Sequence, residues 1–313
     1  MRSVPDFRVF RGSAATVLQL TLLSAAAISP RSDLLAQRGP ADGNAAFVVT
    51  TGWLAAHQRD RDLVLVQVLR DTSSTAEAIP GSRRLTYRDI VTTRDSNSTE
   101  LPSVEALQAT FERLGISNRS RVVVYAPDAP LATRVLFTLD YMGHDRIAFL
   151  DGGLPQWKRE QRTVTTEVVT PTPATFTPHP RPERLVTAEW LSERLDRPGL
   201  SMIDTRTLSE YVGNASATGG SAGHIPGAQS LPWEDLFSDA ERSMLKPRDE
   251  LRRLYDERVR PGDEVVSYCV VGYRGSATWF IARYLGYDAV KLYDGSYQDW
   301  SRRKLPVRAG AAP

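Results

Sequence analysis

Cys269 is the only cysteine among the 313 residues, and Val270, Val271, Gly272, Tyr273, Arg274 and Gly275 follow it. The apolar run before it predicts a strand that ends at the thiol, and a helix is expected from about Ser276. Backbone N–H groups of such a loop, with a helix N-terminus, favour a thiolate and bind anions. We therefore expect Cys269 to be a nucleophile and residues 270–275 to bind its substrate.

Two residues of this loop have specific expected roles. Gly272 allows backbone angles that other residues avoid, so the loop can curl, although an ordinary turn would need the same glycine. Arg274 can supply a positive charge for an anionic substrate, and a salt bridge on the flank of the helix is the alternative. From composition alone, a lone cysteine is more often a small buried apolar residue. The local sequence favours the functional interpretation.

The chain repeats itself. Val122–Trp157 aligns without a gap on Val265–Trp300, because both ends differ by 143 residues. Matching positions include Tyr125 with Tyr268, Gly143 with Gly286, Asp151 with Asp294, Gly152 with Gly295, and Trp157 with Trp300. A second register, offset by 137 residues, aligns Val49, Thr50, Trp53 and Leu54 with Val186, Thr187, Trp190 and Leu191. The repeat predicts two similar domains, at residues 45–160 and 185–307.

Each copy alternates strands with helices, which predicts an α/β fold with a parallel sheet and helices on both faces. A short helix is expected around each first tryptophan, and strands are expected at Leu63–Val68, Leu200–Asp204, Arg121–Tyr125 and Glu264–Tyr268. In the first copy, a helix is expected from about Thr133. Residues 161–184 are rich in Pro and Thr and predict an extended linker. The small-residue insertion from Gly213 to Gly223 predicts a flexible surface loop.

Several motifs together resemble the rhodanese family over roughly residues 45–307. They are Cys-x-x-Gly-x-Arg after a strand, His-Ile-Pro-Gly-Ala at 224–228, Asp204-Thr205-Arg206 and Tyr293-Asp294-Gly295-Ser296. The resemblance implies two rhodanese-like domains and a sulfurtransferase that takes sulfane sulfur from thiosulfate or 3-mercaptopyruvate. Cys269 would carry that sulfur as a persulfide until an acceptor such as cyanide or a thiol removes it.

The first copy has Ala126 where the second has Cys269, and Leu131 stands opposite Arg274. An alanine cannot form a persulfide, so we expect a noncatalytic first domain that closes one wall of the active cleft. Two departures from the family leave the donor open. Val270 and Val271 replace basic residues of the animal thiosulfate enzymes, and Glu210 is the nearest match to an arginine that these enzymes and the mercaptopyruvate group use.

Other polar residues receive structural interpretations. We expect Asp204 and Arg206 to form a supporting ion pair, and His224 to pack and donate hydrogen bonds in its turn. Trp157 and Trp300 are expected in the core. The histidines and the cysteine have no metal-ligand spacing, and the chain lacks a Walker loop and a dinucleotide fingerprint, so no metal or cofactor is expected. A formal charge of +2 without a basic block gives no reason to expect nucleic acid.

Three other functions use the same residues. A cysteine-dependent phosphatase or arsenate reductase is disfavoured, because that pattern has five residues between cysteine and arginine, whereas only four separate Cys269 from Arg274. A noncatalytic exported binding module or sulfur carrier would keep the cysteine but turn over slowly. Redox sensing would need an intermolecular disulfide, since the chain has no second cysteine.

The N-terminus has the layout of a secretory signal peptide. Arg2, Arg8 and Arg11 precede an apolar, small-residue run from Ser13 to Ile28. We expect residues 1–36 to be a signal peptide and N-terminal segment, with cleavage after Ala27 or Ala36, and retention as an anchor is the alternative. The predicted location is outside the cytoplasm, in the periplasm, with no membrane span left after cleavage. Oligomeric state is not predicted.

Overall fold

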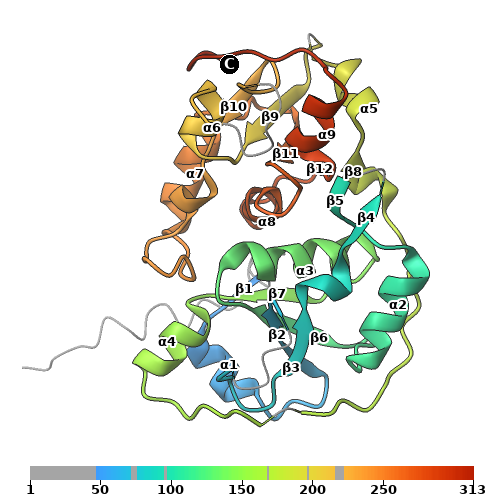
Figure 1. Cartoon of the computed structure of the whole chain (residues 1–313). Coiled ribbons are helices and arrows are strands. Elements are labelled where there is room, and N and C mark those ends of the chain that lie inside the picture. Colours follow the sequence, from blue (N-terminus) through green and yellow to red (C-terminus); the bar gives the residue numbers. More distant parts are fainter. Residues whose placement is uncertain (1–46, 72–75, 95–96, 168, 196, 216–221) are drawn as a thin grey trace, which may run out of the picture. The chain divides into compact units, whose positions relative to one another are not determined.

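The computed structural model describes residues 47–71, 76–94, 97–167, 169–195, 197–215 and 222–313 (Figure 1). The expected signal peptide at 1–36 and the centre of the 213–223 insertion lie outside the described residues. Among the helices that the model describes, none is both long and apolar enough to cross a bilayer.

The structure contains two parallel five-stranded sheets, as the repeat predicts. The first has the order β1 (Val48–Val49), β7 (Ile147–Leu150), β6 (Arg121–Tyr125), β2 (Leu63–Leu69), β3 (Arg83–Thr86). The second has the order β8 (Leu185–Val186), β12 (Val290–Tyr293), β11 (Glu264–Tyr268), β9 (Leu200–Asp204), β10 (Ala228–Ser230). The central strands are almost wholly buried and rich in β-branched residues, which is typical of parallel sheets covered on both faces. The strands β6, β9 and β11 have the bounds expected from the sequence.

Helices cover both faces of each sheet. In the first domain α1 (Thr51–His57) and α4 (Gly153–Arg159) cover one face, and α2 (Val104–Arg113) and α3 (Ala129–Tyr141) cover the other. In the second domain the corresponding pairs are α5 (Ala188–Ser192) with α9 (Ser296–Arg302), and α7 (Arg248–Asp256) with α8 (Gly275–Leu285). The remaining elements that the structure describes in full are a short helix α6 (Leu208–Val212), the 3-10 helices η2 (Tyr87–Ile90), η3 (Pro182–Arg184) and η4 (Trp233–Leu236), and an antiparallel pair, β4 (Thr92–Arg94) with β5 (Asn97–Glu100).

The helix α3, which follows β6, starts earlier than expected. The prediction of a start near Thr133 is wrong, because α3 begins at Ala129. The side chain of Asp128 accepts a hydrogen bond from the N–H of Leu131 and so caps the helix, and Pro130 occupies its first turn. In the second copy α8 begins at Gly275, close to the predicted Ser276.

The two domains pack against each other through α3 and α8, which lie side by side between the sheets (Figure 1). The hydroxyls of Thr133 and Ser276, which are equivalent positions in the repeat, are 2.9 Å apart. Phe137 and Trp279 make an edge-to-face contact with ring centroids 5.0 Å apart. A single cluster of buried apolar side chains runs through both domains at this contact.

The predicted linker is extended but bound to the first domain. Phe176 is fully buried, and its ring lies edge-on to that of Phe111 in α2. The N–H of Phe176 donates to Glu112, and that of Thr177 donates to Asn118. The segment therefore acts as a strap along the first domain and not as a free spacer.

Candidate active site

Cys269 lies immediately after β11, at the carboxyl end of a strand flanked by β9 and β12. This is the position where open parallel sheets bind ligands. The residue is fully buried. Three ionisable side chains lie within electrostatic range of it: Tyr87 and Arg134 from the first domain and Arg274 from its own loop. The site is thus formed by residues of both domains.

The Ser296 hydroxyl holds the first and fourth residues of the cysteine loop together. It accepts hydrogen bonds from the N–H of Cys269 (3.2 Å) and the N–H of Gly272 (2.8 Å), and donates to the carbonyl of Tyr293 (2.7 Å). Ser296 itself has a φ of 53°, a conformation that non-glycine residues seldom adopt. A strained residue at the start of α9 thus fixes the curvature of the loop.

Gly272 is required by both its backbone angle and its surroundings. Its φ is 77°, in the left-handed region. A Cβ atom at this position would lie 2.5 Å from Oδ1 of Asp294 and 2.7 Å from its carbonyl oxygen. The prediction that Gly272 lets the loop curl is confirmed.

The loop leaves several backbone donors without a partner. The N–H groups of Val270, Val271, Tyr273 and Arg274 have no hydrogen-bond acceptor among the residues that the structure describes. The carbonyls of Cys269 and Val270, in contrast, accept from the N–H groups of Tyr297 and Gln298 in α9. With its carbonyls bound and these donors free, the loop can accommodate an anion or a second sulfur atom.

Asp294 links the loop to the first domain. Its Oδ1 is 2.5 Å from Nη1 of Arg134, a fully buried residue of α3, and its Oδ2 accepts from the N–H of Leu101 (2.9 Å). The hydroxyl of Thr99, a residue of β5, donates to the carbonyl of Val271. Three contacts from the first domain therefore brace the loop.

Tyr273 also contacts the first domain. Its hydroxyl donates to Asp128, the residue that caps α3, and its ring lies edge-on to Tyr87 with a centroid separation of 5.3 Å. Arg70 bonds both Asp128 and the Tyr273 hydroxyl. Burial raises the pKa of Tyr87 to about 12. Tyr273 is thus in contact with the neighbouring domain, in addition to the substrate role expected from the sequence. The other flanking glycine, Gly275, packs against Tyr268 and Leu292.

Arg274 is not a free cation. It makes two hydrogen bonds to the carboxylate of Glu210, with Nη1 to Oε2 at 3.1 Å and Nη2 to Oε1 at 3.0 Å. Burial lowers the pKa of Arg274, but Glu210 and Cys269 outweigh this and raise it. The structure therefore contains the salt bridge that was the alternative for Arg274, and its partner is the residue at which an arginine was expected from the family.

Asp204 and Arg206 form the expected ion pair, with Nη2 of Arg206 2.6 Å from Oδ2 of Asp204. Both are buried, and Asp204 also accepts from the hydroxyl of Tyr268, the residue before the cysteine. His224 stacks on Tyr211 with ring centroids 3.8 Å apart, and burial lowers its pKa. These residues support the end of β11 and the turn beside it, as predicted.

Sequence reasoning did not identify Ser296, Asp294, Arg134 or Thr99 as part of the site. A partial signal was present for the first two, because both belong to the Tyr293-Asp294-Gly295-Ser296 motif at the end of the strand next to β11. Arg134 and Thr99 had no local signal, since they approach the loop from the other copy.

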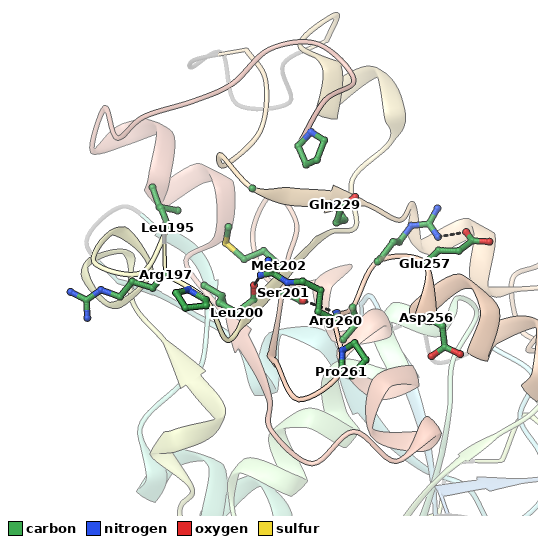
Figure 2. Close-up of a pocket in the computed structure, with 15 residues that line it drawn as sticks. Leu195, Arg197, Leu200, Ser201, Met202, Gln229, Asp256, Glu257, Arg260 and Pro261 are labelled. Carbon is green, nitrogen blue, oxygen red and sulfur yellow. Dashed lines mark hydrogen bonds and ion pairs between the residues drawn. The ribbon is translucent and has the colours of Figure 1, made fainter.

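A surface hollow of about 690 Å³ lies elsewhere in the second domain (Figure 2). It is lined by the start of β9 at Leu200 and Ser201, whereas the cysteine follows the end of the adjacent strand. Two of its three arginines are already bound: Arg258 to the carbonyl of Ser230 and to Glu257, and Arg260 to the carbonyl of Leu200 and to Asp263. It includes no residue of the cysteine loop.

Comparison with known proteins identifies the family. The family model of the rhodanese-like domain matches residues 50–160 and 187–303. A thiosulfate sulfurtransferase of Corynebacterium glutamicum is 30% identical over 84% of this chain and 90% of its own length. One from Pseudomonas aeruginosa is 31% identical over 81% of this chain and 93% of its own. The sulfur carrier protein TtuD of Thermus thermophilus is 30% identical over 84% of this chain and 96% of its own.

Solved structures share the fold. The crystal structure of YnjE superimposes with a TM-score of 0.72 and 24% identity over 84% of this chain and 68% of its own. An anaerobic ergothioneine biosynthesis enzyme from Chlorobium limicola superimposes with a TM-score of 0.74 and 22% identity over 86% of this chain and 71% of its own. This chain therefore belongs to the rhodanese family and is a tandem sulfurtransferase with two rhodanese-like domains.

Proposed function

We propose that Cys269 takes sulfane sulfur from thiosulfate or 3-mercaptopyruvate and carries it as a persulfide to a thiophilic acceptor. The proposal rests on one arrangement: a cysteine at the carboxyl end of β11 whose loop is held by Ser296 at Cys269 and Gly272, with other loop N–H groups free of partners among the described residues. The relatives named thiosulfate sulfurtransferase support the choice of thiosulfate as a candidate donor. The first domain, with Ala126 in place of the cysteine, serves as a noncatalytic support for this loop.

The chemistry needs no cofactor. The Cys269 thiolate attacks the outer sulfur of thiosulfate, an S–S bond forms to the cysteine, and sulfite leaves with the electrons of the broken S–S bond. With 3-mercaptopyruvate the carbon–sulfur bond breaks, and the thiol proton ends on the methyl group of pyruvate. An acceptor such as cyanide then attacks the outer sulfur, thiocyanate leaves, and the thiolate returns. The free N–H groups of the loop stabilise the negative charge on the outer sulfur.

The test is the intact mass of the purified protein before and after thiosulfate or 3-mercaptopyruvate, followed by cyanide. The expected result is a gain of one sulfur mass that needs Cys269 and disappears with cyanide. Cys269→Ser is the control. If neither donor adds sulfur while Cys269 remains reduced and reactive in the unfolded protein, the proposal is wrong.

A sulfur carrier is the second candidate function. Cys269 is fully buried, which would shelter a persulfide from small acceptors in solution, and the relative named as a sulfur carrier protein adds support. Loading would then be stoichiometric, but turnover with cyanide would be slow. A steady-state assay of thiocyanate formation separates the two functions, because an enzyme repeats the cycle of loading and release many times, whereas a carrier releases its sulfur to cyanide only slowly.

We further propose that the protein is exported to the periplasm after removal of its N-terminal segment. The support is the sequence alone: three arginines followed by an apolar run of small residues before Ser29 and Pro30. Expression of the full chain in a bacterium, followed by cell fractionation and N-terminal sequencing, tests this. A periplasmic product that begins after Ala27 or Ala36 is expected. An uncleaved chain that sediments with membranes would favour the anchor instead.

A further inference from the structure

We infer that Glu210 sets the charge of the active site and selects sulfur donors with one negative charge over those with two. This inference rests on the proposed persulfide function and deepens it, because it divides the two candidate donors: 3-mercaptopyruvate carries one negative charge as its carboxylate, whereas thiosulfate carries two.

The Glu210 carboxylate is fixed by its own helix before it meets Arg274. It is the third residue of α6, and its Oε2 accepts from the N–H (2.9 Å) and the hydroxyl (2.8 Å) of Thr207 in a capping box. The side chain of Glu210 is 9% exposed and that of Arg274 is 19% exposed. Because the Glu210 carboxylate is held in place in this way, it fixes the Arg274 guanidinium beside α6. It also neutralises the positive charge of that guanidinium at short range.

Three further arginines near the loop, among the residues that the structure describes, are also paired with carboxylates. Arg134 binds Asp294, Arg206 binds Asp204, and Arg70 binds Asp128. A further carboxylate, Glu234, interacts with Arg274, and its buried Oε2 has no hydrogen-bond partner in the part of the chain that the structure describes. Val270 and Val271 add no charge. Among these described residues the four arginines face five carboxylates, so together they give the surroundings of Cys269 no excess positive charge.

This balance affects the two donors unequally. The Coulomb energy of a donor in a fixed field is proportional to its charge, so a carboxylate near the site penalises a dianion about twice as much as a monoanion. The free N–H groups of the loop attract both donors through partial charges. Glu210 neutralises the one arginine of the loop. It is therefore the residue that weakens the attraction of the site for thiosulfate more than for 3-mercaptopyruvate.

The test is the ratio of kcat/KM for 3-mercaptopyruvate to kcat/KM for thiosulfate, with cyanide as acceptor. In the wild-type protein we expect 3-mercaptopyruvate to be favoured, and added salt to narrow the difference by screening. In Glu210→Gln we expect kcat/KM to rise about tenfold for thiosulfate but only about threefold for 3-mercaptopyruvate. The glutamine keeps the size of the side chain and an oxygen that can accept from Thr207.

Two control variants separate charge from structure. Glu210→Asp keeps the charge and should keep the wild-type ratio, even if both rates fall. Glu250→Gln removes the same charge from α7, where Glu250 pairs with Lys246, and should change neither rate. A wild-type protein that prefers thiosulfate, or an unchanged ratio in Glu210→Gln, overturns the inference while the persulfide function stands. Failure of both donors to load Cys269 in the wild-type protein would instead refute the proposed function.

Discussion

The two copies of the repeat differ most in the segment that follows the central strand of each sheet. After β6, α3 begins within a few residues, at Ala129, because Asp128 caps it. After β11, a loop of six residues intervenes before α8 begins at Gly275. The first copy has thus lost more than a cysteine, because the chain that would form the loop belongs to the helix.

The residues that contact these segments also differ, because only the second copy has a hydroxyl side chain at the position that binds the loop. Ser296 closes the second loop, and its equivalent in the first copy is Gly153, which has no hydroxyl to accept the loop N–H groups. Both residues have a positive φ, 53° for Ser296 and 47° for Gly153. The left-handed backbone conformation at this position is therefore common to the two copies, while the hydroxyl that shapes the active loop is present in only one of them.

The aspartates after the final strands show which part of the interface is shared. Leu101 of the first domain donates its N–H to Asp294, and Leu245 of the second donates its N–H to Asp151. Each domain thus covers the equivalent loop of the other. Only Asp294 has a buried arginine beside it, since Arg134 is replaced by Ala277 at the equivalent position. The first domain therefore has the same backbone contact as the second, and in addition its Arg134 binds Asp294 of the second domain.

The largest expected effect comes from moving the nucleophile between the copies. Cys269→Ser should abolish sulfur loading, and Ala126→Cys in that background should not restore it, because the first copy lacks the loop and its free N–H groups. Intact mass after thiosulfate and 3-mercaptopyruvate checks both variants. A persulfide on the introduced cysteine would break the comparison, because the missing thiol alone would then account for the inactivity of the first copy.

The next largest effect is expected at the ion pair that joins the domains. Arg134→Met should lower the free energy of unfolding by roughly 3–5 kcal/mol, because it leaves the Asp294 carboxylate without its buried partner. Urea denaturation followed by circular dichroism measures this change. Adding Asp294→Asn to the Arg134→Met variant should recover part of the lost free energy of unfolding, because it removes the unpaired buried charge.

The matched control for this pair is Arg146→Met, which breaks a surface pair with Asp62 on the first domain. It should cost less than about 1 kcal/mol, since exposed ion pairs contribute little. Equal losses in Arg134→Met and Arg146→Met would contradict the importance assigned to the buried pair.

A smaller effect is expected when the second copy is given the residue of the first. Ser296→Gly removes the acceptor of two loop N–H groups, and we expect a loss of roughly 1–3 kcal/mol in stabilisation of the loop, seen as about a tenfold or greater fall in kcat/KM. The reverse change, Gly153→Ser, should leave the activity unchanged. If Ser296→Gly keeps full activity with both donors, the loop does not depend on the hydrogen bonds to the Ser296 hydroxyl.

The fold and the nucleophile were predictable from sequence for a simple physical reason. Buried parallel strands such as β9 and β11 are short apolar runs between turns, so their bounds can be read directly, and Cys269 stands at the end of one. The start of α3 was missed although its signal was local. The capping residue Asp128 and the proline at 130 were present, but the expectation followed the second copy, where the loop is longer.

The partners of the site residues could not be predicted, because they come from other elements. Nothing near Arg274 in the sequence indicates that Glu210, 64 residues away, will bind it. The pair of Arg134 with Asp294 spans 160 residues and depends on the packing of α3 against α8. Pairwise chemistry between domains is fixed only when their packing is fixed, so the sequence indicates the nucleophile but not the charge around it.

The smallest expected effect concerns Asp151, the aspartate that lacks an arginine. Burial raises its pKa to about 6 from an ordinary value of 3.8, and the nearby Asp239 adds to this. At pH 4 the carboxyl is largely protonated in the folded protein. As the pH rises from 4 to 6 the unfolded chain ionises first, so the folded state loses stability, and the loss is complete above pH 6. Asp151→Asn should therefore stabilise the protein by roughly 1–2 kcal/mol at pH 8 and hardly at all at pH 4.

Thermal unfolding across this pH range measures the effect, and Asp239→Asn provides a control of opposite sign. Asp239 accepts hydrogen bonds from Ser243 and Met244, and these outweigh burial and lower its pKa. Loss of the Asp239 carboxylate should destabilise the protein at pH 8, and the effect should shrink only when the pH falls below the ordinary carboxyl value of 3.8. If Asp151→Asn instead destabilises the protein at pH 8, the charged Asp151 contributes to the fold as Asp294 does, and the missing arginine does not distinguish the two copies.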